Sequence, residues 1–388
     1  MVRRAANEPL PGAPEPWKAS EMPAFRGRPP YFMSQMIAAE PALAERLIHR
    51  LSTDETVEQL VSAIRDATAA GRPIATTGCG TSEHAAMGLA ALLTEALDLP
   101  AGRDVQSIQA LETLARPVAD GLLIAVSHEG GTHITNEALR AARDAGARTA
   151  LITVGGESPG AELADIVVRT EEQDQSWCHT VGYLSPLLAG VVLAANLSRS
   201  RVDALAIRAL LDVADDPHAA ASTASALASS DRLIVAGAGV DHVSARELAL
   251  KVAEGARLPA SAHQLETLLH GHLAAATRWT GLVLLMTTPG HRDGPIRERS
   301  ARVLSAARAL AVPAAAILSA EVADSIPDEE TPAGRIVLPR TGRVGGVAGS
   351  LLGSAVALQL LAERLARARG VNPDTLGRED PAQAVAHG

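Results

Sequence analysis

The sequence predicts an α/β protein made of two tandem, doubly wound parallel sheets, each a flavodoxin-like three-layer α/β/α domain. First, short apolar runs alternate with amphipathic stretches of helical length in residues 72–93, 121–146 and 147–155. This alternation of strands with helical crossovers is typical of a parallel sheet. Second, the same order recurs in the other half of the chain, in residues 232–256 and 280–295.

The two halves keep a nearly constant register. Gly237 follows Gly78 by 159 residues, and Gly281 follows Gly121 by 160, so tandem duplication explains the recurrence better than chance. Prolines and glycines interrupt every periodic pattern ahead of residue 31. We therefore predict four parts: a flexible N-terminal arm over residues 1–30, a first domain over 31–210, a second domain over 211–370 and an irregular C-terminal tail over 371–388.

Composition narrows the possible partners and location. The chain has 388 residues, 47% of them hydrophobic, which is enough for two buried cores. Its net charge is -9 and it has no basic block, which disfavours nucleic acid as a partner. The two cysteines, Cys79 and Cys178, are too few for a disulfide framework and indicate a reducing compartment. No apolar run suggests a signal peptide or a membrane span, so we expect a cytoplasmic protein with no membrane partner.

Two glycine-containing loops follow predicted strands, at residues 78–82 and 127–132. Parallel sheets bind ligands at the carboxyl ends of their strands, where helix N-termini favour anions. The hydroxyls of Ser127 and Thr132 could donate to an oxyanion, and capping the next helix is their alternative role. A dinucleotide site is disfavoured because the first loop has G-x-G without a third glycine, and no acidic residue follows about 20 residues on.

A second group of candidate residues lies on one predicted helix in the other half. Glu247, Lys251 and Glu254 are separated by four and three residues, which places them on one helical face. His270 follows in the segment LETLLHGHLAA. A solvated, salt-bridged helix followed by a polar loop histidine is the alternative interpretation of these residues.

The segments GCGTSEHAA and AVSHEGGT resemble the sugar isomerase (SIS) domain family. The tandem arrangement is similar to the isomerase half of glucosamine-6-phosphate synthase and to fructosamine-phosphate deglycases. The resemblance implies that the two loops hold the phosphate of a sugar. The predicted substrate-binding residues are Gly80, Thr81, Ser82, Ser127, His128, Glu129 and Thr132. Glu129 stands where the family has a phosphate-contacting serine, so a different anionic group or a neutral group on the substrate is an open alternative.

In the second half, the resemblance implies roles for four residues. Glu254 matches the proton-transfer glutamate, His270 the ring-opening histidine, and Lys251 and Glu247 the supporting pair. A carboxylate can move a proton between adjacent carbons, and a group that titrates near neutrality suits ring opening. The family places this histidine at a subunit boundary, so the resemblance also implies a homodimer with shared active sites.

Together these residues predict a cofactor-independent aldose–ketose isomerase acting on a sugar phosphate or on a sugar with another anionic terminus, such as a sulfonate. A fructosamine deglycase is the alternative, and a non-catalytic sugar-phosphate sensor is a third interpretation. We do not expect a glutamine amidotransferase, because Val2 follows the initiator methionine and no glutaminase domain fits ahead of residue 31. The family's C-terminal Schiff-base lysine is also missing, since no lysine follows Lys251. No metal site is expected, because no established zinc motif has the spacing of His263, Glu266, His270 and His272.

Overall fold

The computed structural model describes residues 26–100, 102–170, 172–214, 216–378 and 380–386, so most of the predicted arm over 1–30 lies outside the described residues. The chain divides into two compact units. The first contains Ala39–Gln175 and Val181–Arg208, and the second contains Arg26–Ala38, Ser176–Thr180 and Ala209–Gly388. Each unit draws on separate stretches of the chain.

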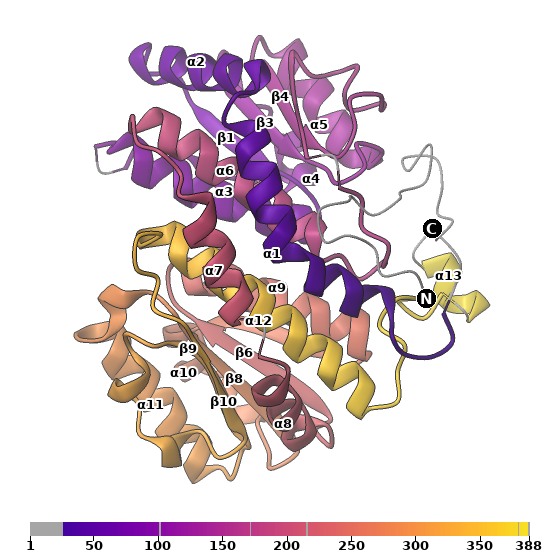
Figure 1. The fold of residues 1–388 in the computed structure, drawn as a ribbon, viewed down its shortest axis with the longest axis vertical. Coiled ribbons are helices and arrows are strands. Elements are labelled where there is room, and N and C mark those ends of the chain that lie inside the picture. The colour runs from indigo at the N-terminus through magenta and orange to yellow at the C-terminus, as the bar shows by residue number, and fades with distance from the viewer. Residues whose placement is uncertain (1–25, 101, 171, 215, 379, 387–388) are drawn as a thin grey trace. The chain divides into compact units, whose positions relative to one another are not determined.

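The first unit is built on a parallel sheet, part of which is labelled in Figure 1. Its strand order is β2-β1-β3-β4-β5. Its strands are β1 (Ile74–Thr77), β2 (Gln106–Ser107), β3 (Leu122–Val126), β4 (Arg148–Thr153) and β5 (Ile166–Arg169). The chain winds outward from β1 in both directions, so its crossovers put helices on both faces. One face is covered by α2 (Glu55–Ala69), α3 (Thr81–Leu97) and α6 (Val181–Leu197), and the other by α4 (Ala110–Ala115) and α5 (His133–Asp144).

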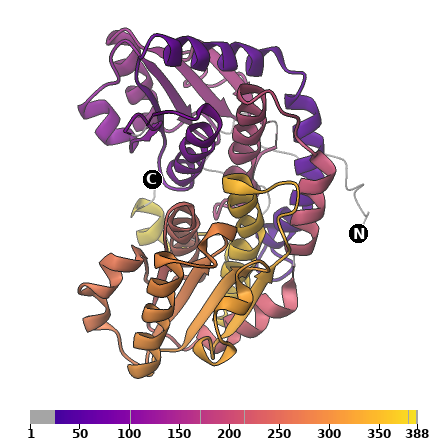
Figure 2. The same cartoon turned by 90° about the vertical axis from the view of Figure 1, so that its left-hand side faces the viewer.

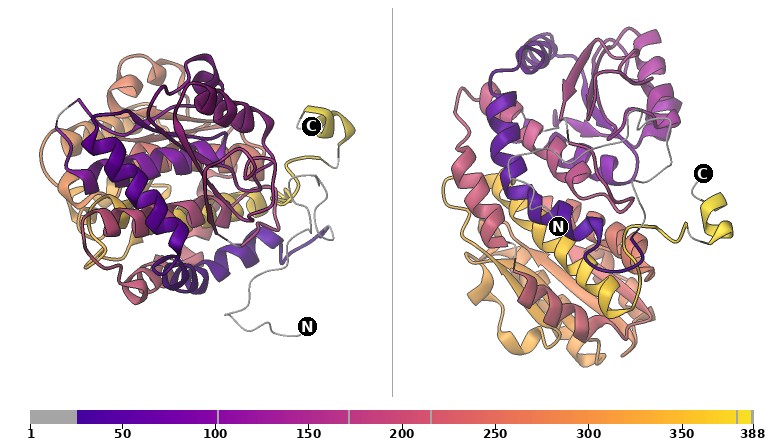
Figure 3. Two further views of the ribbon diagram at one scale, coloured as in Figure 1. Left: turned by 90° about the horizontal axis from the view of Figure 1, so that it is seen from above. Right: turned by 45° about the vertical axis from the view of Figure 1, so that its right-hand side comes forward.

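The second unit has the same architecture, with the strand order β10-β9-β8-β6-β7. Its strands are β6 (Arg232–Gly237), β7 (Ala260–Gln264), β8 (Thr280–Met286), β9 (Ala314–Ser319) and β10 (Gly334–Leu338). Figures 2 and 3 show its sheet between two helical layers. One layer contains α8 (Pro217–Leu227), α9 (Val240–Ala256) and α12 (Gly346–Ala368), and the other contains α10 (Leu265–Leu269) and α11 (Pro295–Ala309).

The strands are buried in the way that a sheet covered on both faces requires. All residues of β3 and β8 are buried, and the strands are continuous apolar runs without alternation. Leu139 and Ala142 of α5 pack on Leu123 and Leu151 of the sheet. The predicted fold class, two tandem doubly wound parallel sheets, is confirmed.

The segment after α12 differs from the irregular tail that the sequence predicts. It ends in a short helix, α13 (Pro381–Ala386), and its earlier part binds the start of α1 (Phe32–Leu51). The Asp374 carboxylate accepts hydrogen bonds from the backbone N–H groups of Phe32 at 2.8 Å and Met33 at 2.9 Å. It therefore satisfies two of the N–H groups that a helix N-terminus leaves without partners.

One helix among the described residues, α12, is long and apolar enough to cross a membrane by length and composition alone. Within the fold, 83% of its apolar window is buried. It packs on α8 and α9 as a core helix of the second unit. The remaining helix of more than one turn is α7 (Ala204–Ala214).

Candidate active site

The two predicted binding loops lie side by side at one edge of the first sheet. Strands β1 and β3 are parallel neighbours, with Thr77 opposite Ala125, so their carboxyl ends place residues 78–82 next to residues 127–132. The first loop needs Gly78, because a Cβ there would lie 2.6 Å from the Ser82 carbonyl oxygen. The arrangement lets the first turn of α3 fold tightly back over the strand end.

The residues of these two loops differ in burial. Ser82 and Ser127 are buried, whereas Gly80 and Thr132 are exposed. The Ser127 hydroxyl donates to the Thr132 hydroxyl at 3.5 Å. Thr132 occupies the N-cap position of α5, but among the described residues its side chain makes no capping hydrogen bond. Helix capping therefore does not account for a threonine at this position. Both loops open onto helix N-termini, which favour a negatively charged group.

His128 lies in the interior of the first unit and not at the mouth of the loop. Its Nε2 accepts a hydrogen bond from the Asp174 backbone N–H at 2.9 Å. The Asp174 carboxylate in turn accepts from the Gly182 N–H at 2.7 Å, at the start of α6. The imidazole of His128 therefore fixes the segment that connects β5 to α6. Contact between the His128 side chain and a substrate stays a prediction.

Burial lowers the pKa of His128 to about 4. The ordinary value is 6.5, so between pH 6.5 and pH 4 the unfolded chain binds a proton that the folded chain does not. We expect this stability contribution to be complete above pH 6.5 and to be lost as the pH falls toward 4, by about 3 kcal/mol. The variant His128→Gln keeps an acceptor but does not titrate. Its free energy of unfolding, measured in urea, should therefore fall less steeply between pH 6.5 and pH 4 than that of the wild type. Equal slopes would contradict the assignment.

Glu129 also has a protein partner within the first unit. Its carboxylate accepts a hydrogen bond from the Gln173 side-chain amide at 3.3 Å. Sequence reasoning missed Gln173 and Asp174, since they belong to no glycine motif. The available signal was a run of polar residues, 170–176, between an apolar strand and an apolar helix.

The predicted acid–base residues of the second unit meet on α9. The Lys251 ammonium lies 3.5 Å from the Glu247 carboxylate and 2.6 Å from the Glu254 carboxylate. The side chains of Lys251 and Glu247 are fully buried, while that of Glu254 is 21% exposed. Burial alone would lower the pKa of Lys251, but its two carboxylate partners outweigh that effect and hold the pKa above its usual value. The lysine is therefore a permanent cation beside a carboxylate that solvent can reach.

His270 occupies a different environment. It follows α10, and its side chain is 80% exposed and lies 3.1 Å from the Glu266 carboxylate. With Gly271 and His272 it lines an open hollow of about 700 Å³. Among the described residues, no hydrogen bond or ion pair joins His270 to Glu254 or Lys251, so a shared site for the four predicted catalytic residues stays a prediction.

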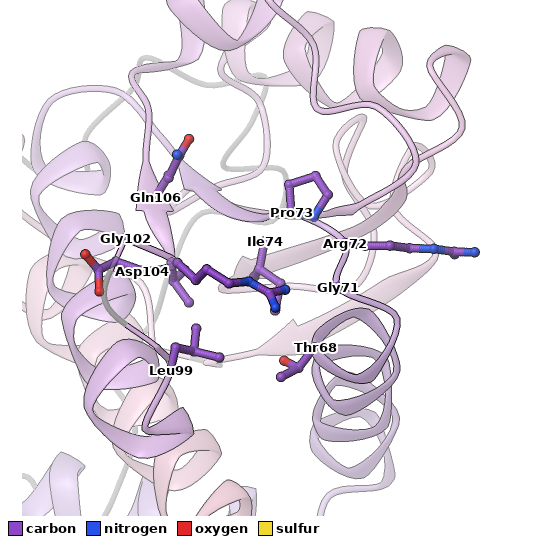
Figure 4. A pocket seen from close by; sticks show the side chains of 11 residues that line it. Thr68, Gly71, Arg72, Pro73, Ile74, Leu99, Gly102, Asp104 and Gln106 are labelled. Atoms are coloured by element: carbon purple, nitrogen blue, oxygen red, sulfur yellow. The ribbon is translucent and has the colours of Figure 1, made fainter.

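Another cavity, of about 220 Å³, lies at the opposite edge of the first sheet (Figure 4). Its lining includes Thr68, Ile74, Asp104 and Gln106, at the amino ends of β1 and β2. None of the predicted site residues lines it. The candidate residues therefore stay those of the two loops in the first unit and, separately, those of α9 in the second unit.

Comparison with known proteins identifies the first unit. Residues 70–196 match the family described as SIS domain. The chain contains an SIS domain. The match includes both glycine loops of the first unit, from Gly78 to Thr132.

Similarity to a known protein extends beyond residues 70–196. The chain is 31% identical over 379 residues to a glutamine–fructose-6-phosphate aminotransferase (isomerizing) of Symbiobacterium thermophilum. That match covers 90% of this chain and 58% of the relative, so the chain spans little more than half of the relative's length.

Solved structures show the same fold. The C-terminal domain of glucosamine-fructose-6-phosphate aminotransferase from Francisella tularensis superposes with a TM-score of 0.76 at 20% identity, covering 90% of this chain and 99% of that one. Tagatose-6-phosphate ketose/aldose isomerase from Escherichia coli gives 0.73 at 17% identity, covering 92% and 98%. At these identities the likeness establishes the fold, which is two tandem SIS-type α/β domains.

Proposed function

We propose that this SIS protein is a cofactor-independent aldose–ketose isomerase for a sugar phosphate or for a sugar with another anionic terminus. The observation that carries the proposal is the pairing on α9 of a buried cation with a carboxylate that solvent can reach, at 2.6 Å. The names of the similar proteins, which include a ketose/aldose isomerase, support a sugar as the substrate.

In the proposed reaction, the loops of the first unit bind the anionic end of the sugar. The helix N-termini and the hydroxyls of Ser82, Ser127 and Thr132 supply the donors. Gly80, Thr81 and Glu129 belong to the same loops. The Glu129 carboxylate, which accepts a hydrogen bond from Gln173, would repel a phosphate dianion, so a substrate terminus of lower charge is favoured.

Proton transfer is assigned to Glu254. Its carboxylate removes the proton from the carbon beside the carbonyl and returns it to the neighbouring carbon, through an enediol. Lys251 stabilises negative charge on the enediolate oxygens, while Glu247 fixes Lys251.

Ring opening is assigned to His270. Because its side chain is 80% exposed in the single chain, we propose that it serves a site completed by a second copy of the chain. A homodimer with shared active sites, in the cytoplasm, is part of this proposal. Sedimentation of the purified protein tests it, and a monomer at enzyme-assay concentrations would contradict it.

The reaction is tested by solvent-deuterium exchange. The protein is incubated in D₂O with sugar phosphates, sugar sulfonates and fructosamines, and NMR follows deuterium at C1 and C2. We expect deuterium in the isomerised sugar of one class. Amine release from a fructosamine would support the deglycase alternative, and binding without exchange would support a sensor.

A further inference from the structure

We propose that the second unit contains a copy of the anion-binding loop pair whose anion position is filled by the protein's own Asp241 carboxylate. This inference rests on the proposed function of the first-unit loops and goes beyond it. It predicts that each chain binds the anionic end of its ligand in the first unit only.

The backbone of the two loops is nearly the same. Gly80 precedes α3 with φ 58° and ψ −127°, and Gly239 precedes α9 with φ 56° and ψ −128°. Both helices have 17 residues. Two residues beyond each glycine, the N–H groups of Ser82 and Asp241 both donate to a loop carbonyl at 3.1 Å. Asp241 therefore occupies in the second unit the position of Ser82 in the first.

The Asp241 carboxylate receives the donors that a bound anion would attract. Its Oδ1 accepts from the Thr287 backbone N–H at 3.0 Å and from the Thr287 hydroxyl. Its Oδ2 lies 3.1 Å from His291 Nδ1 and 3.4 Å from the Thr288 hydroxyl. These partners belong to the loop after β8, which corresponds to the first unit's loop after β3 at an offset of 160 residues.

The first unit lacks this internal carboxylate. Ser82 is a neutral, shorter side chain, and the Ser127 hydroxyl, at the position of Thr287, bonds to Thr132 at 3.5 Å within its own loop. Asp241 is 1% exposed, so its negative charge is fixed where a second anion would have to sit. The Asp241 carboxylate would repel an anion placed beside it, so the second loop pair is closed to an anion.

The test counts inorganic phosphate bound per chain by isothermal titration calorimetry at constant ionic strength. Asp241→Ser gives the second unit the residue that the first unit has, and we expect it to bind one phosphate more than the wild type. Asp241→Asn is the matched control, because its amide still fills the position, and it should bind the same number as the wild type.

A folded Asp241→Ser variant that binds no additional phosphate would overturn the inference. The reciprocal variant Ser82→Asp provides a second test, because a carboxylate introduced there should abolish any phosphate binding by the first unit. Retained binding in Ser82→Asp would also overturn it. If the wild-type protein binds no phosphate, that result contradicts only the proposal that the first unit binds a sugar phosphate. The inference about the second unit is still tested, because it depends on the difference in bound phosphate between Asp241→Ser and Asp241→Asn.

Discussion

Glu254→Gln is expected to lower the rate of isomerisation about a thousandfold while changing the affinity for the sugar less than threefold. General acid–base groups contribute rate factors of about 10² to 10⁴. Glutamine keeps an oxygen that can accept from Lys251, which lies 2.6 Å from the native carboxylate, but it cannot take a proton. The loss should therefore fall on kcat, measured with the substrate that the deuterium experiment identifies.

The control for this variant is Glu58→Gln, an exposed glutamate on α2 far along the chain from α9. It removes the same charge and should keep full activity. A Glu254→Gln enzyme with more than a tenth of the wild-type kcat would remove Glu254 from the reaction.

Lys251→Met is expected to destabilise the fold by about 3 to 5 kcal/mol. The substitution leaves the Glu247 carboxylate fully buried without its cation, and removing one partner of a buried pair has a cost of this size. The shift in urea unfolding measures it. Replacing both members, in Glu247→Gln with Lys251→Met, should recover part of the loss because the fully buried Glu247 charge is then removed as well.

Arg140→Met is the matched control for the lysine variant. Arg140 pairs with Glu137 on α5, where the two side chains are 50% and 31% exposed, and exposed pairs contribute at most about 1 kcal/mol. A Lys251→Met variant no less stable than Arg140→Met would show that Glu247 does not need its cation.

The fold could be predicted because each signal was local. Glycine at the strand ends, apolar strands and the 159-residue register gave two sheets of one topology without any knowledge of long-range contacts. The one-face arrangement of Glu247, Lys251 and Glu254 likewise follows from helical spacing, and the structure places all three in contact.

The sequence could not predict contacts between residues far apart in the chain. His128 appeared as a loop residue, and only the folded chain shows that Asp174, 46 positions later, occupies its Nε2. Asp241 went unnoticed because an acidic residue in the first turn of a helix is ordinary. Its partners are 46 to 50 positions away, at the end of another strand.

The bond from Asp374 to the start of α1 has a consequence for how the protein is made. A ribosome delivers Met33 341 residues before Asp374, so the first turn of α1 waits for its carboxylate while the intervening chain is made. Most of the first unit is available by Arg208 and can fold ahead of the second. Loss of the Asp374 carboxylate should therefore first loosen the start of α1.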